Sequence, residues 1–165
     1  MKIFILRHGI TGDAATDAER DLTSAGRQEV VKIVRQKVED LQAVKRIYSS
    51  PMVRVKNTID IAKNLMRFDG EVIIEPNLNA GSRLPELKAF MDSIDPSMGD
   101  IMISSHQSCT SILVLVLTGE DLLIPNGSLI CIEVDEVAQG KGKIVWQESA
   151  SGAEIKRTEN FVDFV

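Results

Sequence analysis

The sequence predicts an α/β fold, in which helices flank a mostly parallel central sheet in a single three-layer domain and a β-hairpin closes the C-terminal side. Short apolar runs typical of buried strands alternate with segments whose apolar residues recur at helical spacing. Of the 165 residues, 44% are hydrophobic and 26% are charged, as in an ordinary globular protein. No repeat, low-complexity tract or long linker divides the sequence, so we expect one domain over residues 1–165.

The expected elements follow one another as strand and helix. Continuous apolar runs predict buried strands at residues 3–6, 44–48, 72–74 and 101–103. Helical spacing predicts helices from the cap Thr23 to Leu41, from Ser49-Ser50-Pro51 to Met66, from Pro85 to Ile94, and from Ser111 to Leu117 with an end near Gly119. Two further runs, 129–134 and 143–146, predict the closing hairpin. The residues after Glu148 show weak periodicity and receive no assignment.

Charge and cysteine content narrow the class of protein. With 19 Lys and Arg against 24 Asp and Glu, the net charge is −5, which argues against binding to nucleic-acid phosphates. The two cysteines form neither a CxxC pair nor a disulfide framework, which favours a reducing compartment. After the first predicted strand, the longest apolar run is Ile112 to Leu117. It has six residues, whereas a helix that spans a bilayer needs about 20. We therefore expect a cytoplasmic protein that binds neither nucleic acid nor a membrane.

Cationic and imidazole side chains follow three of the predicted strands. Arg7-His8-Gly9 follows the first strand, and Arg54 lies one turn beyond Ser49-Ser50-Pro51 at the end of the second. Ser104-Ser105-His106 follows the fourth strand. Because open α/β sheets bind ligands at the carboxyl ends of their strands, we expect these two histidines and two arginines to converge.

Two guanidinium groups and two imidazoles suit a dianionic phosphoryl group. Guanidinium groups bind phosphate oxygens bidentately, through charge-assisted hydrogen bonds. A histidine with a pKa of about 6.5 can offer a free ring nitrogen near neutral pH and attack phosphorus. Because phosphoryl transfer is catalysed chiefly by positioning and electrostatic stabilisation, this combination predicts a phosphoryl-transfer site.

A zinc site is the main alternative at the same strand ends. Its ligands would be His8 together with residues of His106-Gln107-Ser108-Cys109. Zinc prefers three or four N, S or O ligands, and two neighbouring guanidinium cations raise the electrostatic cost of holding a dication. We therefore expect neither a metal nor a cofactor.

Three motifs, in this order along the chain, resemble the histidine phosphatase superfamily, which includes the cofactor-dependent phosphoglycerate mutases. Arg7-His8-Gly9 is similar to the signature of the family, and Ser105-His106 is similar to its second histidine. The segment from Ser50 to Thr58, SPMVRVKNT, is similar to its Ser-Pro-x-x-Arg-x-x-x-Thr motif. The resemblance covers residues 1 to about 147 and implies a phosphoglycerate mutase-like fold. The short length, the loop 13–20 and the segment 125–128 make small bacterial phosphohistidine phosphatases of the SixA type the most similar group.

The resemblance also implies roles for individual residues. It implies that His8 is the phosphorylated nucleophile, that Arg7, Arg54 and His106 contact the phosphoryl oxygens, and that Arg20 is a further contact. For Arg20, an ion pair with a neighbour such as Glu19 is an equally simple expectation.

Local chemistry refines the expected roles of the two histidines. We expect one ring nitrogen of His8 to attack while the other donates to a backbone carbonyl. Gly9 either gives the chain room to turn beside the pocket or is an ordinary turn glycine. We expect His106 to donate a hydrogen bond to a phosphoryl oxygen, in either its neutral or its protonated form.

The sequence offers several candidates, and no single clear one, for a general acid that protonates the leaving group. Phosphatases that expel an alkoxide usually need one, and the resemblance places it in the middle of the chain. Glu86 is the only carboxylate in the matching region, residues 77–86, but it also suits the first turn of a helix after Pro85. Asp13, Asp17 and Glu19 are further candidates, although they are explained as simply by solvated charge in a loop.

The resemblance therefore implies a phosphatase, and we expect its substrate to be a protein phosphohistidine, such as that of a histidine phosphotransfer domain in signalling or sugar uptake, with inorganic phosphate as product. The labile P–N bond needs little help from an acid, and the segment from Pro51 to Ser105 leaves no room for a large lid. A phosphatase or mutase for small phosphorylated metabolites and a catalytically silent phosphate-binding module stay open as alternatives.

Overall fold

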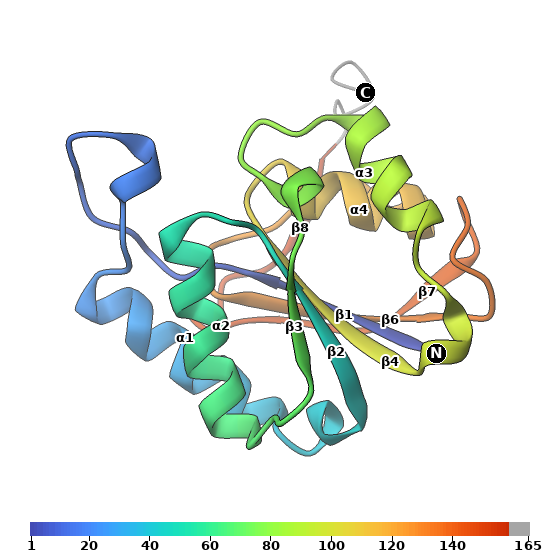
Figure 1. Cartoon of the computed structure of the whole chain (residues 1–165), viewed down its shortest axis with the longest axis horizontal. Helices are drawn as coiled ribbons and strands as arrows, with labels where there is room; N and C mark the ends of the chain where they lie inside the picture. Colours follow the sequence, from blue (N-terminus) through green and yellow to red (C-terminus); the bar gives the residue numbers. More distant parts are fainter. Residues whose placement is uncertain (159–165) are drawn as a thin grey trace.

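A computed structural model describes residues 1–158, which contain a six-stranded sheet of order β3-β2-β4-β1-β6-β7 (Figure 1). Four strands are parallel: β1 (Lys2–Arg7), β2 (Val44–Ser49), β3 (Glu71–Ile74) and β4 (Asp100–Ser105). Antiparallel pairing adds β6 (Ser128–Val134) to β1 and β7 (Gly142–Ser149) to β6. The predicted parallel sheet and closing hairpin are thereby confirmed.

Two helices cover each face of the sheet, because the side chains of β1 alternate between two apolar clusters. Phe4 and Leu6 are buried with residues of α1 (Ser24–Lys37) and α2 (Val53–Met66). Ile3 and Ile5 are buried with residues of α3 (Leu84–Asp92) and α4 (Cys109–Thr118). Figure 1 shows these helix pairs on opposite sides of the sheet, so the expected three layers are confirmed.

Helix boundaries differ from the prediction in all four helices, including α3, which runs from Leu84 to Asp92 and not from Pro85 to Ile94. The helix capped by Thr23 ends at Lys37, and Leu41 is buried from a separate 3₁₀ turn, Asp40–Ala43. The second helix begins at Val53, after the cap residue Met52, so Pro51 lies before the helix and not in its first turn. The fourth begins two residues earlier than expected, at Cys109. Side-chain spacing marks a buried face, but the backbone hydrogen bonds that end a helix leave a weaker sequence signal.

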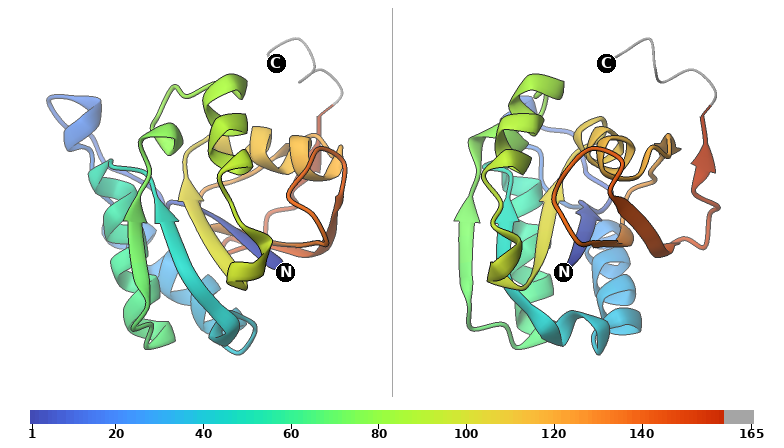
Figure 2. Two further views of the ribbon diagram at one scale, coloured as in Figure 1. Left: turned by 45° about the vertical axis from the view of Figure 1, so that its right-hand side comes forward. Right: turned by 90° about the vertical axis from the view of Figure 1, so that its right-hand side faces the viewer.

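The loop between β1 and α1 and the C-terminal segment contain elements without a sequence prediction. A 3₁₀ helix, Asp17–Glu19, lies in the first loop, which stands at the carboxyl end of the parallel strands (Figure 2). A two-stranded antiparallel ribbon pairs β5 (Leu122–Leu123) with β8 (Lys156–Arg157). Within residues 1–158, no helix has the length and apolar character needed to span a membrane.

Candidate active site

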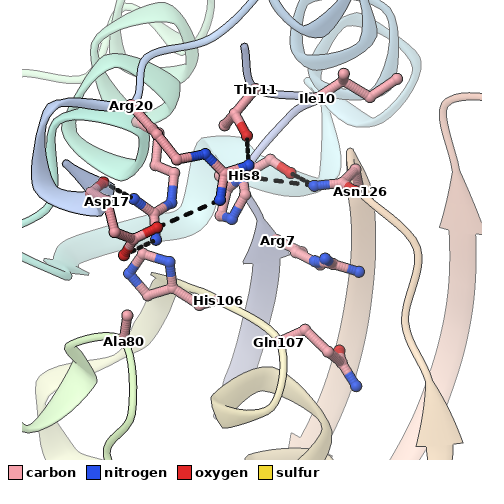
Figure 3. Close-up of a pocket in the computed structure, with 11 residues that line it drawn as sticks. Arg7, His8, Ile10, Thr11, Asp17, Arg20, Ala80, His106, Gln107 and Asn126 are labelled. Carbon is pink, nitrogen blue, oxygen red and sulfur yellow. Dashed lines mark hydrogen bonds and ion pairs between the residues drawn. The ribbon is translucent and has the colours of Figure 1, made fainter. Parts of the chain in front are cut away.

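A pocket of about 420 Å³ lies at the carboxyl ends of β1 and β4 (Figure 3). The structure brings five of the predicted site residues to its wall: Arg7, His8, Arg20, Arg54 and His106. The rest of the wall is formed by Ile10, Thr11, Asp17, Ala80, Gln107 and Asn126. Residues that are far apart in the sequence meet here because β1 pairs directly with β4, with Arg7 opposite Ser105.

His8 follows β1 and has its ring buried at the pocket wall, with 6% of the residue exposed. Its Nδ1 lies 2.8 Å from the carbonyl oxygen of Gly9, and because a carbonyl only accepts, this nitrogen carries the ring proton. Burial, followed by the charges of Arg7 and Arg54, lowers the pKa of His8 to about 4. Near neutral pH the ring is therefore uncharged, with the lone pair of Nε2 available for attack.

Gly9 is required by a close approach of two backbone segments. A Cβ atom at Gly9 would collide with the carbonyl oxygen of Gly26 in α1, and a Cβ at Gly26 would collide with the carbonyl oxygen of Ile10. The loop is held on the start of α1 by the Thr23 N–H, which donates to the Ile10 carbonyl at 3.0 Å. Gly9 therefore acts through this packing and through its carbonyl group on His8, and its side-chain position does not line the pocket.

His106 follows β4 and lies beside His8, with 5.3 Å between the ring centroids. Its Nε2 is 2.8 Å from Oγ of Ser50, whereas its buried Nδ1 has no hydrogen-bond partner within residues 1–158. Burial, followed by the neighbouring His8 and the positive charge of Arg54, lowers the pKa of His106 to about 3. Of the two expected forms, the structure therefore favours the neutral imidazole near pH 7.

Arg7 and Arg54 supply positive charge to the pocket from buried positions. Arg7 donates from Nη1 to the carbonyl of Ile124, and Arg54, which is 4% exposed, donates from Nη1 to the carbonyl of Asp17 at 2.8 Å. The Nε atoms of both arginines are buried and have no acceptor among the described residues. Because both guanidinium groups are positively charged and lie at the pocket wall, they favour an anion in the pocket.

Arg20 does not pair with Glu19, the neighbour named as an example from the sequence. Its Nη1 lies 3.3 Å from Oδ1 of Asp17, whose Oδ2 lies 3.1 Å from Nη2 of Arg54. Glu19 instead accepts a hydrogen bond from the Thr16 hydroxyl. Asp17 thus joins two pocket arginines (Figure 3), and the hydrogen bond from Arg54 is the main cause that lowers the pKa of its carboxyl group. Asp17 is therefore a solvated loop carboxylate, with 53% of its side chain exposed, and also the partner of two pocket arginines.

Glu86, the candidate general acid, does not reach the pocket. Its carboxylate accepts a hydrogen bond from the backbone N–H of Arg83 at 3.0 Å, at the start of α3. Backbone hydrogen bonds lower the pKa of Glu86, which is opposite to what an acid near neutral pH needs. Of the two roles left open by the sequence, the structure supports helix capping, because Glu86 is the third residue of α3 and its carboxylate bonds back to the N-cap residue Arg83.

The zinc alternative needed Cys109 to face the two histidines. The thiol of Cys109 instead lies 3.4 Å from the carbonyl oxygen of Asn79 and 3.6 Å from that of Ser82. Within the part of the chain that the structure describes, no three or more His, Cys, Asp or Glu side chains are grouped so that they could hold a metal ion.

Asn126 is a site residue to which the sequence analysis gave no role. Its Nδ2 donates to the carbonyls of His8 and Gly9, at 3.2 and 3.4 Å. The position of Asn126 follows from the sheet topology. Because β6 pairs antiparallel with β1, the residues just before β6 lie beside those just after β1. The contact between Ser50 and His106 has a similar origin in the pairing of β2 with β4.

Comparisons with known proteins agree with the motifs and the fold. The histidine phosphatase superfamily (branch 1) model matches residues 3–80. The phosphohistidine phosphatase SixA of Escherichia coli (strain K12) is 25% identical over 157 residues, which cover 90% of this chain and 94% of SixA.

Solved structures share the fold over nearly the whole chain. A structure of the protein histidine phosphatase SixA complexed with tungstate has a TM-score of 0.82 at 24% identity, covering 92% of this chain and 98% of that one. The α-ribazole phosphatase of Shigella flexneri has a TM-score of 0.74 at 16% identity, with coverage of 91% and 97%. The solved structures confirm the fold, and the family model together with the SixA relative confirms the resemblance to the histidine phosphatase superfamily and supports phosphatase activity.

Proposed function

We propose that this protein is a phosphohistidine phosphatase that transfers the phosphoryl group of a protein phosphohistidine to Nε2 of His8 and then to water. The observation that carries the proposal is the neutral ring of His8, anchored through Nδ1 on Gly9, in a pocket with three guanidinium groups. The curated relative that is named as a phosphohistidine phosphatase supports the same substrate. A histidine phosphotransfer protein of the cytoplasm is the partner that we propose.

The first step forms a covalent intermediate. The Nε2 lone pair of His8 attacks phosphorus, the P–N bond to the substrate imidazole breaks, and the departing nitrogen takes a proton from solvent. Arg7 and Arg54 stabilise the charge on the equatorial oxygens, and His106 donates to one of them. In the second step water attacks phosphorus, the bond to His8 breaks, and inorganic phosphate leaves.

The state of Arg54 in this structure implies that the ligand must compete for it. Its Nη1 and Nη2 donate to the carbonyl and carboxylate of Asp17. A phosphoryl group that binds Arg54 through these nitrogens has to share or displace Asp17. Because a phosphoryl dianion carries more charge than one carboxylate, we expect it to win this competition.

The lack of an acid in the pocket favours phosphohistidine over a phosphate ester. Among the described residues, Asp17 is the one carboxylate at the pocket wall, and its lowered pKa keeps it ionised near neutral pH. An alkoxide leaving group needs a proton from such a group, whereas a labile P–N bond needs less help. The short helix α3 and its flanking turns add no separate lid between β2 and β4.

The proposal is tested by comparing rates on a phosphohistidine-bearing phosphotransfer protein with rates on a panel of small phosphate monoesters. Enzyme quenched under alkaline conditions, which preserve phosphohistidine, should carry phosphate on His8 by mass spectrometry. A clear preference for monoesters would replace the substrate assignment with a metabolite phosphatase or mutase. Tight phosphate or tungstate binding without turnover of any substrate would identify a silent binding module.

A further inference from the structure

The contact between Ser50 and His106 lies just behind the pocket. Ser50 Oγ and His106 Nε2 are 2.8 Å apart, and the two residues are 0% and 2% exposed. Ser50 does not line the pocket, so it cannot act by touching the substrate directly. The contact depends on the register of the sheet. Ser49 at the end of β2 is paired with Ser104 of β4, so the residues that follow the two strands, Ser50 and His106, lie side by side.

The surroundings of the Ser50 hydroxyl indicate which group donates. The backbone N–H of Met52 points to Oγ of Ser50 at 3.4 Å, so this oxygen already accepts a hydrogen bond. Within residues 1–158, the only other partner of the hydroxyl is His106 Nε2. The hydroxyl hydrogen therefore satisfies its bonding by donation to Nε2, and the reverse arrangement would leave that hydrogen buried without an acceptor.

Donation by Ser50 decides what the other nitrogen of His106 presents. A neutral imidazole has one N–H, so a ring that accepts at Nε2 carries its hydrogen at Nδ1. Nδ1 is buried without a partner among the described residues, and His106 lines the pocket with its ring 5.3 Å from that of His8 and beside Asp17 in Figure 3. In this tautomer the pocket receives a hydrogen-bond donor. In the opposite tautomer it receives a lone pair, which would repel a phosphoryl oxygen.

We propose that Ser50 is a positioning residue that holds neutral His106 in its Nδ1–H tautomer, so that His106 donates a hydrogen bond to a phosphoryl oxygen. This inference deepens the proposed function and rests on it for its kinetic consequence. A tautomer set by a neutral hydroxyl needs no proton uptake from solvent. Donation by His106 is therefore independent of pH across the neutral range.

Nitrogen-15 NMR of histidine-labelled protein tests the tautomer directly, and the chain has only two histidines. In the wild type at pH 7, Nδ1 of His106 should give a protonated, pyrrole-type signal and Nε2 a pyridine-type signal. Ser50→Ala should shift both signals toward a mixture of tautomers while those of His8 stay in place. Ser104→Ala is the matched control, because its buried hydroxyl donates to the Leu6 carbonyl and does not touch His106. Unchanged His106 signals in Ser50→Ala would overturn the proposal.

Kinetics then separate positioning from simple packing. Ser50→Ala should lower kcat about 10- to 100-fold with little change in KM, because the donated hydrogen bond matters most in the transition state. Ser50→Thr keeps the hydroxyl and should regain most of the rate, whereas Ser104→Ala should retain the wild-type value. Equal losses in Ser50→Ala and Ser104→Ala would assign both serines to packing and contradict the inference.

The two proposals fail in different ways. If the wild type turns over no phosphoryl substrate, the proposed function is wrong, while the NMR signals still report whether Ser50 sets the tautomer. If the wild type hydrolyses phosphohistidine and Ser50→Ala keeps both its rate and its Nδ1–H signal, the function stands and the role of Ser50 is wrong.

Discussion

The two histidines of the pocket share a low pKa but differ in what they present to a ligand. His8 rests its Nδ1 on a carbonyl oxygen, which only accepts, and so exposes the lone pair of Nε2. His106 places its Nε2 against a hydroxyl group, which can donate, and so presents Nδ1–H. In the proposed mechanism, two side chains of one type thereby serve as a nucleophile and a hydrogen-bond donor. The partner behind each ring, and not the ring itself, decides its chemistry.

The largest effect is expected from removing each histidine in turn. His8→Ala should lower turnover at least about 10⁴-fold and abolish acid-labile labelling, because the covalent route is lost. His106→Ala should lower turnover about 10²- to 10³-fold and leave His8 able to carry phosphate. Rapid-quench kinetics and mass spectrometry of each variant check this difference. Labelled enzyme in His8→Ala, or equal losses in both variants, would contradict the division of roles.

A smaller difference in kcat/KM is expected between variants of Arg54, which is buried, and of Arg20, which is exposed. Both arginines pair with Asp17. Arg54→Ala should lower kcat/KM by about 10²- to 10³-fold, in the range of removing a charge-assisted donor from a desolvated site. The Arg20 side chain is 40% exposed, so solvent screens its charge and Arg20→Ala should lower kcat/KM by about tenfold or less. Steady-state rates on the phosphohistidine substrate measure both. An unchanged kcat/KM in Arg54→Ala would place this residue outside the working site.

A further effect is expected on folding, and it follows from the low pKa that both rings have. Both pKa values fall from 6.5, to about 4 for His8 and about 3 for His106, so the folded state binds protons less readily than the unfolded state. Stability is therefore complete above pH 6.5 and declines as the pH falls toward 4. Lowering the pH from 7 to 5 should reduce the free energy of unfolding by about 2 kcal/mol for each of the two histidines.

Urea titrations of the wild type and of His106→Gln at pH 7 and pH 5 measure this loss. The variant should lose about half as much stability as the wild type over the same interval, because one of the two rings has been removed. Equal losses would mean that groups other than these histidines control the acid limb.

Sequence reasoning predicted the sheet and the strand-end residues better than it predicted their partners. Buried runs such as Ile3–Leu6 and the positions of His8 and His106 are local signals, and parallel pairing alone brings strand ends together. The bond of Asp17 to Arg54 spans 37 residues and depends on how the first loop turns over the pocket, which no periodicity encodes. Glu86 was assigned to two roles from one position, and only coordinates could separate a helix cap from a pocket acid.

The contact of Gly9 with Gly26 has a mechanical consequence. Backbone resting on backbone has no rotamers with which to absorb a displacement, so a shift of α1 is passed on to the carbonyl that sets the proton of His8. The stiffness of α1, which contributes no residue to the pocket wall, therefore influences the orientation of the His8 ring.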